Sequence, residues 1–456
     1  MPALGGPARI ISAALSWASK PAWSPDGKWL YISATQSSDQ NVGIYAIPLG
    51  GGDTRRLTET PAGGSLGDVD PAESPDGRQL VFVRQTGAFA ADLYGLDLRD
   101  GAAVPRRITS DHVQKFSPVW TADGQEVVHI AGEPNGARGI YRLSIRDGKS
   151  RRIEGIGDSA VALAIATKGH RLVYAKSVRD INIWRLAFPT PGGAAGPSAK
   201  FLSSTRFEAS PAYSPDGKRI AFASNRGGFQ QIWVADADGS NPSPVTNFTE
   251  GVAGSPRWSP DGQTIVFDAR PSGNADVYEV RADGGTPKRL TDHPAEDHLP
   301  CFSPDGQTIY FASMRTGQRQ IFRMPANGGE ALQVTRNGGY GSMPSTDGKW
   351  IYYSIIGKGL WKMPVGGGAE TQVVDFAYPF GFSVTARGIY FAGRSDPASR
   401  KTPLQFYRFE DEKVVNLGFF DKPLTLHISV SPDEKWLLYS QLDQWSDDLM
   451  LVENFR

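Results

Sequence analysis

The 456-residue sequence contains a single cysteine, Cys301. One thiol can form neither an intramolecular disulfide nor a cysteine-based zinc site, so neither device organises this chain. An excess of charge is also missing, because 48 Lys and Arg balance 48 Asp and Glu. A protein that mainly binds nucleic acid needs a surplus of Lys and Arg, and the balance therefore argues against a nucleic-acid partner.

Long hydrophobic runs are absent too. No apolar stretch approaches the roughly 20 residues of a membrane helix, so we expect no membrane span. Residues 10–18 are apolar and small enough to imitate a short secretion signal, but they fit the repeat described below better. The chain as written indicates a cytoplasmic location, and a signal or anchor in a longer N-terminus would place it in the periplasm.

Glycine and proline, by contrast, are abundant, with 52 Gly and 33 Pro in the chain. This amount of chain-turning residues is too high for a helical bundle or a coiled coil. It is typical of many short strands joined by turns, and we expect an all-β fold.

The turns belong to an internal repeat of about 45 residues, a period associated with four-stranded propeller blades. Its landmark is Ser-Pro-Asp-Gly, in which Pro presets φ, Asp bonds its own backbone and Gly accepts a positive φ. An alternating apolar segment follows each turn, as expected of a hairpin. The tetrapeptide occurs unaltered at 24–27, 74–77, 214–217, 259–262 and 303–306, and in variant form at 121–124, 345–348 and 431–434.

An aliphatic residue followed by an aromatic one marks the next strand of most units, as in Ile232-Trp233 and Val277-Tyr278. Together the landmarks give about ten units, of which those around 168–170 and 386–388 lack the turn. We therefore predict a β-propeller of four-stranded blades with about ten repeats. A single domain, 1–456, that forms one ring is the simplest geometry, and two smaller rings remain an alternative.

The ends of the chain suggest how such a ring is closed. The last unit, 425–456, supplies three strands, and residues 1–12 align with 324–335, the end of a third strand and a fourth strand. We predict that an N-terminal strand at 8–12 completes the last blade, which would remove exposed sheet edges.

These repeats resemble a known family. Ser-Pro-Asp-Gly, the alternating strand, then Ser-Asn-Arg at 224–226 or Ser-Met-Arg at 313–315, look like the TolB-type, WD-like β-propeller repeat of bacteria. The C-terminal segment 448–454 is similar to the end of the propellers that follow winged-helix domains in bacterial transcriptional regulators. The resemblance implies a platform that binds a ligand or a protein, and it specifies fold more than function.

A recurring arginine is the main candidate for binding. It lies at the end of the second strand or in the next loop, on the face that also carries the loops entering the inner strands, which we call the loop face. Guanidinium groups suit carboxylates, so an acidic peptide or another anionic ligand is the expected guest, although each arginine could instead pair with an acid of its own or the adjacent blade. The candidates are Arg84, Arg138, Arg179, Arg226, Arg270, Arg315 and Arg394, with Phe207, His298 and Tyr340 from neighbouring loops.

The densest set of possible metal ligands is Asp292-His293 with Glu296-Asp297-His298. His293 and His298 are weak metal candidates, because their spacing fixes no coordination sphere, and we expect no cofactor. A Gly-x-Ser-x-Gly match centred on Ser65 is flanked by loop residues and lacks the strand-to-helix elbow of a catalytic serine.

The sequence thus predicts a non-enzymatic binding or scaffold module for a protein, a peptide or a small ligand, the sensor part of a larger bacterial protein. Two alternatives stay open. One is a hydrolase or lyase whose site, with or without a metal, is assembled from several blades. The other is a purely structural platform for assembly.

Overall fold

The structure is a computed structural model of the chain. It describes residues 10–11, 15–36, 41–60, 67–86, 90–111, 113–132, 138–166, 170–271, 274–399, 401–420, 422 and 424–455. Throughout these residues the secondary structure consists of β-strands and turns. Within them no helix is long and apolar enough to cross a membrane.

The chain divides into two compact units, each considered by itself below. Unit 1 comprises Met1–Glu133, Ala137–Ser177 and Asp447–Arg456, and unit 2 comprises Pro134–Gly136 and Val178–Ser446. The predicted all-β fold with repeated four-stranded antiparallel sheets is confirmed. A single ring of ten blades is not confirmed.

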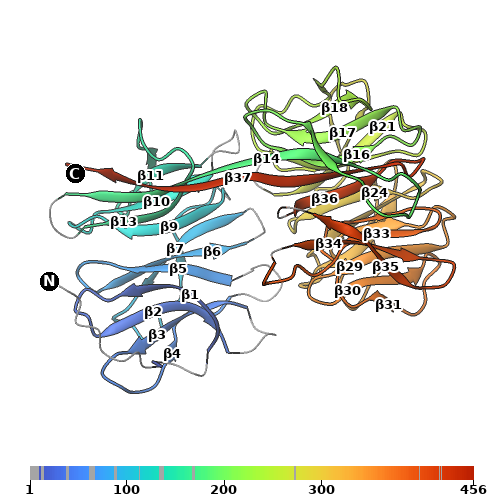
Figure 1. Ribbon diagram of the computed structural model, residues 1–456. Helices are drawn as coiled ribbons and strands as arrows, with labels where there is room; N and C mark the ends of the chain where they lie inside the picture. The colour runs from blue at the N-terminus through green and yellow to red at the C-terminus, as the bar shows by residue number, and fades with distance from the viewer. Residues whose placement is uncertain are drawn as a thin grey trace. The chain divides into compact units, whose positions relative to one another are not determined.

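Unit 1 contains three four-stranded sheets whose strands follow one another in sequence (Figure 1). The first is β1 (Ser16–Trp23), β2 (Trp29–Thr35), β3 (Gly43–Pro48) and β4 (Arg55–Arg56). The second is β5 (Gly67–Glu73), β6 (Gln79–Gln85), β7 (Ala91–Asp97) and β8 (Arg106–Arg107). The third is β9 (Lys115–Trp120), β10 (Glu126–Gly132), β11 (Arg138–Ser144) and β12 (Ser150–Arg152), and β13 (Ala160–Ile165) packs beside it.

Unit 2 contains five sheets of the same sequential kind. They begin with β16 (Glu208–Tyr213), β17 (Arg219–Ser224), β18 (Gln231–Asp236) and β19 (Ser243–Pro244), then β20 (Ala253–Trp258), β21 (Thr264–Ala269), β22 (Asp276–Arg281) and β23 (Lys288–Arg289). The next are β24 (Asp297–Phe302), β25 (Thr308–Ser313), β26 (Gln320–Pro325) and β27 (Leu332–Gln333), then β28 (Ser342–Pro344), β29 (Trp350–Ile355), β30 (Gly359–Pro364) and β31 (Thr371–Val374). The last is β32 (Phe382–Val384), β33 (Gly388–Ala392), β34 (Thr402–Arg408) and β35 (Val414–Phe420).

One further sheet joins distant parts of the chain. It has the order β13, β14 (Leu172–Ala187), β37 (Trp436–Val452) and β36 (Leu424–Val430), and β15 (Ser198–Leu202) pairs with β14. The strands β36, β37, β14 and β15 therefore form the sixth sheet of unit 2, with two strands from each end of that unit. In Figure 1 β14 is green and β37 is red, and they run side by side.

This sheet replaces the predicted completion of the last blade by residues 8–12. Residues 8, 9 and 12 lie outside the described residues, and Ile10 and Ile11 are exposed and in no strand. In the described part of the chain, β14 and β15 supply the third and fourth strands instead.

The Ser-Pro-Asp-Gly turns form as their chemistry predicts. In the turn after β20, the Ser259 hydroxyl donates a hydrogen bond of 2.5 Å to Asp261 and accepts one from the Thr264 amide at 2.9 Å. Gly262 has φ of 69°, in the region that glycine adopts without strain. The turn therefore fixes the connection between the innermost strand of each sheet and the next strand.

The innermost strands carry a second recurring feature, a bulge with a positive φ. Asp70, Ser210, Ser255 and Leu299 all have φ between 52° and 56° in the middle of these strands. The register of strand pairing shifts there, for example between Gly254 and Arg257. Bulges re-aim side chains, and here they occur in the strands that surround the middle of each unit.

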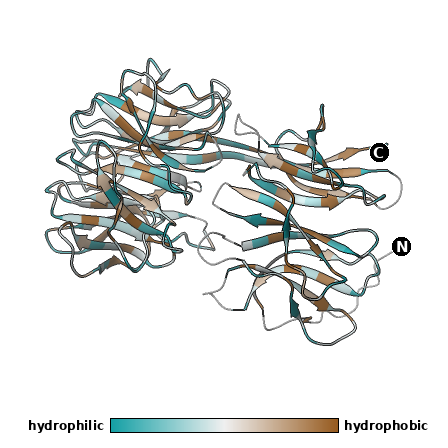
Figure 2. Cartoon of the chain, turned by 180° about the vertical axis from the view of Figure 1, so that it is seen from behind, coloured by the Kyte–Doolittle hydropathy of each residue, from teal (hydrophilic) through white to brown (hydrophobic). Residues whose placement is uncertain are grey.

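Apolar side chains fill the spaces between adjacent sheets. Figure 2 colours the backbone by hydropathy and shows hydrophobic segments within the strands. Between the sheets that start with β16 and β20, Trp258, Ile265, Phe267 and Tyr278 belong to one buried cluster. The Trp258 indole also donates a hydrogen bond of 2.9 Å to the carbonyl of Ala212 on the neighbouring sheet. The inner strands of unit 2 contact one another in the cycle β16, β20, β24, β28, β32 and β36, and β36 contacts β16 again.

Candidate functional site

A cavity of about 410 Å³ lies among the inner strands of unit 2. Its walls come from β16, β20, β28, β32 and β36 and from the turns that follow four of them. Because Pro215 and Pro432 of these turns line it, the cavity lies toward the face that carries the Ser-Pro-Asp-Gly turns, which we call the turn face. Its volume is that of a site for a small molecule or the end of a peptide.

Arg257 of β20 is the cation of this cavity. Its Nη1 donates a hydrogen bond of 2.9 Å to the carbonyl of Pro256, and among the described residues no ion pair joins it to a carboxylate. Burial lowers the pKa of Arg257 to about 10, so the guanidinium stays protonated at neutral pH. An uncompensated positive charge therefore faces the cavity.

The other polar groups of the wall are mostly hydroxyls. Ser429 accepts a hydrogen bond of 3.1 Å from the Tyr213 amide, and Ser383 accepts one of 3.3 Å from the Val430 amide. One carboxylate, Glu434, also lines the cavity. It is already bound, at 2.6 Å to the Arg387 guanidinium and at 2.9 Å to the Tyr390 hydroxyl.

Toward the loop face the channel narrows. A second cavity of about 20 Å³, the space of a single water molecule, shares Arg257 and Met343 with the first and is lined by Phe380 and His427. A chain of rings from four successive sheets lies beside it. The centroids are 5.5 Å apart for His298 and Tyr340, 4.7 Å for Tyr340 and Phe380, and 5.3 Å for Phe380 and His427.

Four of the predicted loop-face arginines form ion pairs within their own sheets. Arg84 bonds Asp68 at 2.7 and 2.8 Å, Arg226 bonds Glu208 at 3.2 Å, Arg270 lies 3.2 Å from Asp268, and Arg315 bonds Asp297 at 2.6 Å. Except for Asp268, these acids belong to the innermost strand. All four are thus paired with an acid of their own sheet, which was the alternative to a binding site. Their role in binding stays a prediction.

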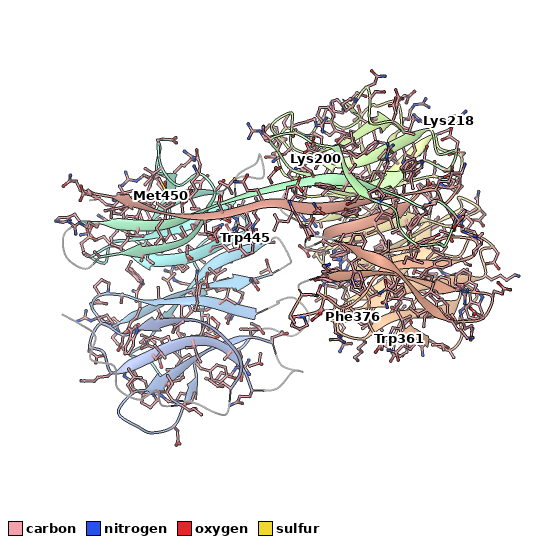
Figure 3. All side chains as sticks on the ribbon, in the orientation of Figure 1. Lys200, Lys218, Trp361, Phe376, Trp445 and Met450 are labelled. Carbon is pink, nitrogen blue, oxygen red and sulfur yellow. The ribbon has the colours of Figure 1, made fainter. Side chains whose placement is uncertain are left out.

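The remaining three arginines lie over aromatic rings. Arg138 lies 4.2 Å from the ring centroid of Phe116, Arg179 lies 5.0 Å from that of Trp445 and Arg394 lies 4.5 Å from that of Phe376. Trp445 and Phe376 are labelled in Figure 3. These are cation–π contacts within unit 1 for Arg138 and within unit 2 for the other two.

His298 and Tyr340 meet in the ring chain, whereas Phe207 does not belong to it. His298 is 4% exposed, and among the described residues its Nε2 has no hydrogen-bond partner. Burial, with the charges of Arg319 and Arg270, holds the pKa of His298 well below its usual value, so the imidazole is neutral. Tyr340 packs under Arg319 at 4.2 Å, and the Phe207 amide donates to Asn225 at 2.9 Å.

The two histidines proposed as weak metal ligands have separate surroundings. His293 accepts a hydrogen bond of 3.0 Å at Nδ1 from the Ala295 amide, while His298 lies in the ring chain. In the described part of the chain, no cluster of three or more His, Cys, Asp and Glu side chains could hold a metal ion. Ser65 lies outside the described residues.

Arg257 was missed by the sequence analysis, although the repeat contains the signal for it. The position two residues before the first residue of the turn is small or apolar in the other units with this turn or its variants. The residues at this position are Ala22, Ala72, Val119, Ala212, Arg257, Cys301, Met343 and Ser429. A charged residue in such a series stands out once the units are compared position by position.

Repeated four-stranded sheets around inner strands define the class of protein as a β-propeller. Residues 66–246 and 201–371 match the family model of the TolB beta propeller domain. The chain belongs to this family.

Relatives agree with this assignment. The chain is 27% identical over 213 residues to the uncharacterized peptidase YuxL of Bacillus subtilis, a match covering 45% of this chain and 29% of that protein. It is 29% identical over 240 residues to the Tol-Pal system protein TolB of Francisella tularensis, covering 48% and 49% of the two chains. The chain thus spans less than half the length of these relatives.

Among solved structures, TolB from Acinetobacter baumannii covers 74% of this chain with 82% of its own, at 17% identity and a TM-score of 0.41. The TolB-like part of the resemblance is supported by the family match. The association with winged-helix transcriptional regulators is not shown and remains a prediction.

Proposed function

We propose that this TolB-like propeller is a binding module for a protein or peptide, and that the guest enters the central cavity of unit 2 from the turn face. The observation that carries the proposal is the cavity of about 410 Å³ among the inner strands. The name of the Francisella relative, a Tol-Pal system protein, is in keeping with a role in a protein assembly.

The face of this proposed site differs from the one expected from the sequence. The arginines of the loop face are engaged by acids or aromatic rings, whereas Arg257 faces open space. A surface with a free cation and a preformed cavity is a better binding site than a surface of satisfied ion pairs.

We further propose that the module binds without catalysing a reaction. The pair that most resembles catalytic machinery is Ser210 with His427, whose Oγ and Nδ1 lie 2.9 Å apart. The imidazole otherwise contacts the Phe380 ring, and the nearby charge that lowers its pKa is the Arg257 cation. A serine nucleophile needs an acid that orients and stabilises its histidine, and a cation beside the ring opposes that role.

A cavity-blocking variant tests the binding proposal. Ala386 is exposed and lines the cavity, so Ala386→Trp places an indole at the mouth with little effect on the core. We expect this variant to lose binding of a random hexapeptide pool that the unmodified protein retains, measured by mass spectrometry of the retained peptides. Ala102→Trp, at an exposed turn of unit 1, is the control. Equal retention by Ala386→Trp and the unmodified protein would remove the cavity from the proposal.

A further inference from the structure

The central cavity has a chemical polarity that narrows the class of guest. Among the described residues, its walls contain a cation and hydroxyl groups, and the carboxylate of Glu434 is bound by Arg387 and Tyr390. Such a wall attracts anions and leaves a cationic guest without a free partner.

Arg257 differs from the loop-face arginines, which form ion pairs or lie over aromatic rings. Arg315, for example, has a buried carboxylate at 2.6 Å and lies 4.9 Å from the ring centroid of Phe322. In the described part of the chain, Arg257 donates a hydrogen bond from one guanidinium nitrogen, Nη1, to a neutral carbonyl. The planar fork of the guanidinium therefore keeps donors for a planar, bidentate acceptor, which in a peptide is a carboxylate.

The hydroxyls of the wall complement the same acceptor. In the described contacts Ser383 and Ser429 accept hydrogen bonds from backbone amides, so their O–H groups are available to donate. A carboxylate has four acceptor sites and no donor, and it matches a set made of one guanidinium and two hydroxyl donors.

The shape of the cavity favours the end of a chain over its middle. The space decreases from about 410 Å³ near the turns to about 20 Å³ beside Phe380 and His427. A guest that enters from the turn face must end near Arg257, because the ring chain leaves no room for further residues. A C-terminal carboxylate satisfies both the shape and the charge.

We propose that Arg257 binds the C-terminal carboxylate of a peptide inserted into the cavity from the turn face. This inference rests on the binding function proposed above and names the group that the site recognises. Acidic side chains and small organic acids offer the same carboxylate chemistry, and the test separates them from a peptide C-terminus.

The probes are two pools of N-acetylated random hexapeptides that exclude Asp and Glu, one pool with a free C-terminal carboxylate and the other with an amide, together with succinate. We expect the unmodified protein to retain the acid pool and not the amide pool. Arg257→Met should weaken binding of the acid pool by about tenfold or more, and Arg257→Lys should restore part of it, because Lys keeps the charge without the fork. Arg281→Met, an exposed arginine on β22 paired with Asp283, is the matched control and should bind as the unmodified protein does.

Each outcome supports or overturns the proposal that Arg257 binds a peptide C-terminus. Equal binding of the two pools, or undiminished binding of the acid pool by Arg257→Met, would overturn the inference. Binding of succinate that depends on Arg257, with neither pool retained, would overturn the peptide source. If Ala386→Trp abolishes retention and Arg257→Met does not, the binding function stands and this inference fails; if Ala386→Trp has no effect, the binding site itself is wrong. Circular dichroism and urea unfolding confirm that each variant is folded.

Discussion

The indole nitrogen of Trp184 donates a hydrogen bond of 2.9 Å to the carboxylate of Asp443, although 259 residues separate them in sequence. The same carboxylate accepts a hydrogen bond of 2.9 Å from Asn182 and lies 2.6 Å from the ammonium of Lys200, which is labelled in Figure 3. Asp443 thus links β37 to both β14 and β15. Burial raises its pKa, but bonds from Lys200, Gln441 and Asn182 outweigh this and hold the pKa below its usual value.

Replacing this carboxylate should loosen the sixth sheet of unit 2. We expect Asp443→Ala to lower the free energy of unfolding by about 2–4 kcal/mol, because the donors Trp184, Asn182, Lys200 and Gln441 lose a shared, mostly buried acceptor. Urea unfolding followed by tryptophan fluorescence measures the change. Asp283→Ala removes an exposed carboxylate from a surface ion pair and should leave the unfolding midpoint unchanged. An equal effect of both substitutions would contradict the role assigned to Asp443.

The ion pair between Arg315 and Asp297 should contribute to folding. Asp297 is fully buried, so Arg315→Met leaves an unpaired charge and should cost about 3–5 kcal/mol. The double variant with Asp297→Asn should be more stable than the sum of the single effects predicts, because it removes the orphaned carboxylate as well. A double-mutant cycle by urea unfolding measures this coupling. Simple additivity would show that the pair does not act as a unit.

The buried histidines make stability depend on pH. Burial, together with the charge of Arg257, holds the pKa of His427 well below its usual value. The unfolded chain therefore binds the proton more readily than the folded one, and stability is lost as the pH falls below about 6.5. Groups facing this imidazole are Ser210, Phe380 and Arg257, none of which is an acid that would oppose the effect.

A variant isolates this contribution. Between pH 7 and pH 5, one neutral buried imidazole lowers the free energy of unfolding by up to about 2 kcal/mol. In His427→Gln the difference in stability between these two pH values should be smaller by that amount. Urea unfolding at both pH values provides the measurement, and an unchanged difference would mean that folding does not lower the pKa of His427.

Local chemistry explains what the sequence could reveal. The Ser-Pro-Asp-Gly turns form because each acts through its own few atoms, as the bond from Ser259 to Asp261 shows. The strands after the turns are buried on both faces, as in β21 with five consecutive buried residues, and their positions follow directly from the apolar pattern. These features gave the all-β class, the four-stranded sheets and the TolB-like family.

Long-range pairing explains what could not be predicted. The pairing of β37 with β14 depends on contacts between segments far apart in sequence, and the pattern of residues 172–202 does not predict it. Four of the seven loop-face arginines form ion pairs and three lie over aromatic rings, and their sequence pattern alone does not distinguish such contacts from a binding site. A comparison of the units marks Arg257 as an unusual charged residue, and the structure adds that it lines a cavity where, among the described residues, no carboxylate pairs with it.

Arg257 also predicts a conflict between stability and binding. Burial lowers its pKa from the usual value of an arginine to about 10, which corresponds to about 3 kcal/mol of unfavourable free energy for keeping the charge in place. Arg257→Met retains an apolar stem of similar length without the charge, so it should raise the free energy of unfolding by about 1–3 kcal/mol. Urea unfolding of this variant beside Arg281→Met, in which the replaced guanidinium is exposed, measures the gain in stability.

Replacing a residue whose role is only structural should destabilise the protein. A loss of stability in Arg257→Met would therefore assign the guanidinium to the architecture, whereas a gain means that the fold tolerates an unfavourable charge whose benefit lies in binding.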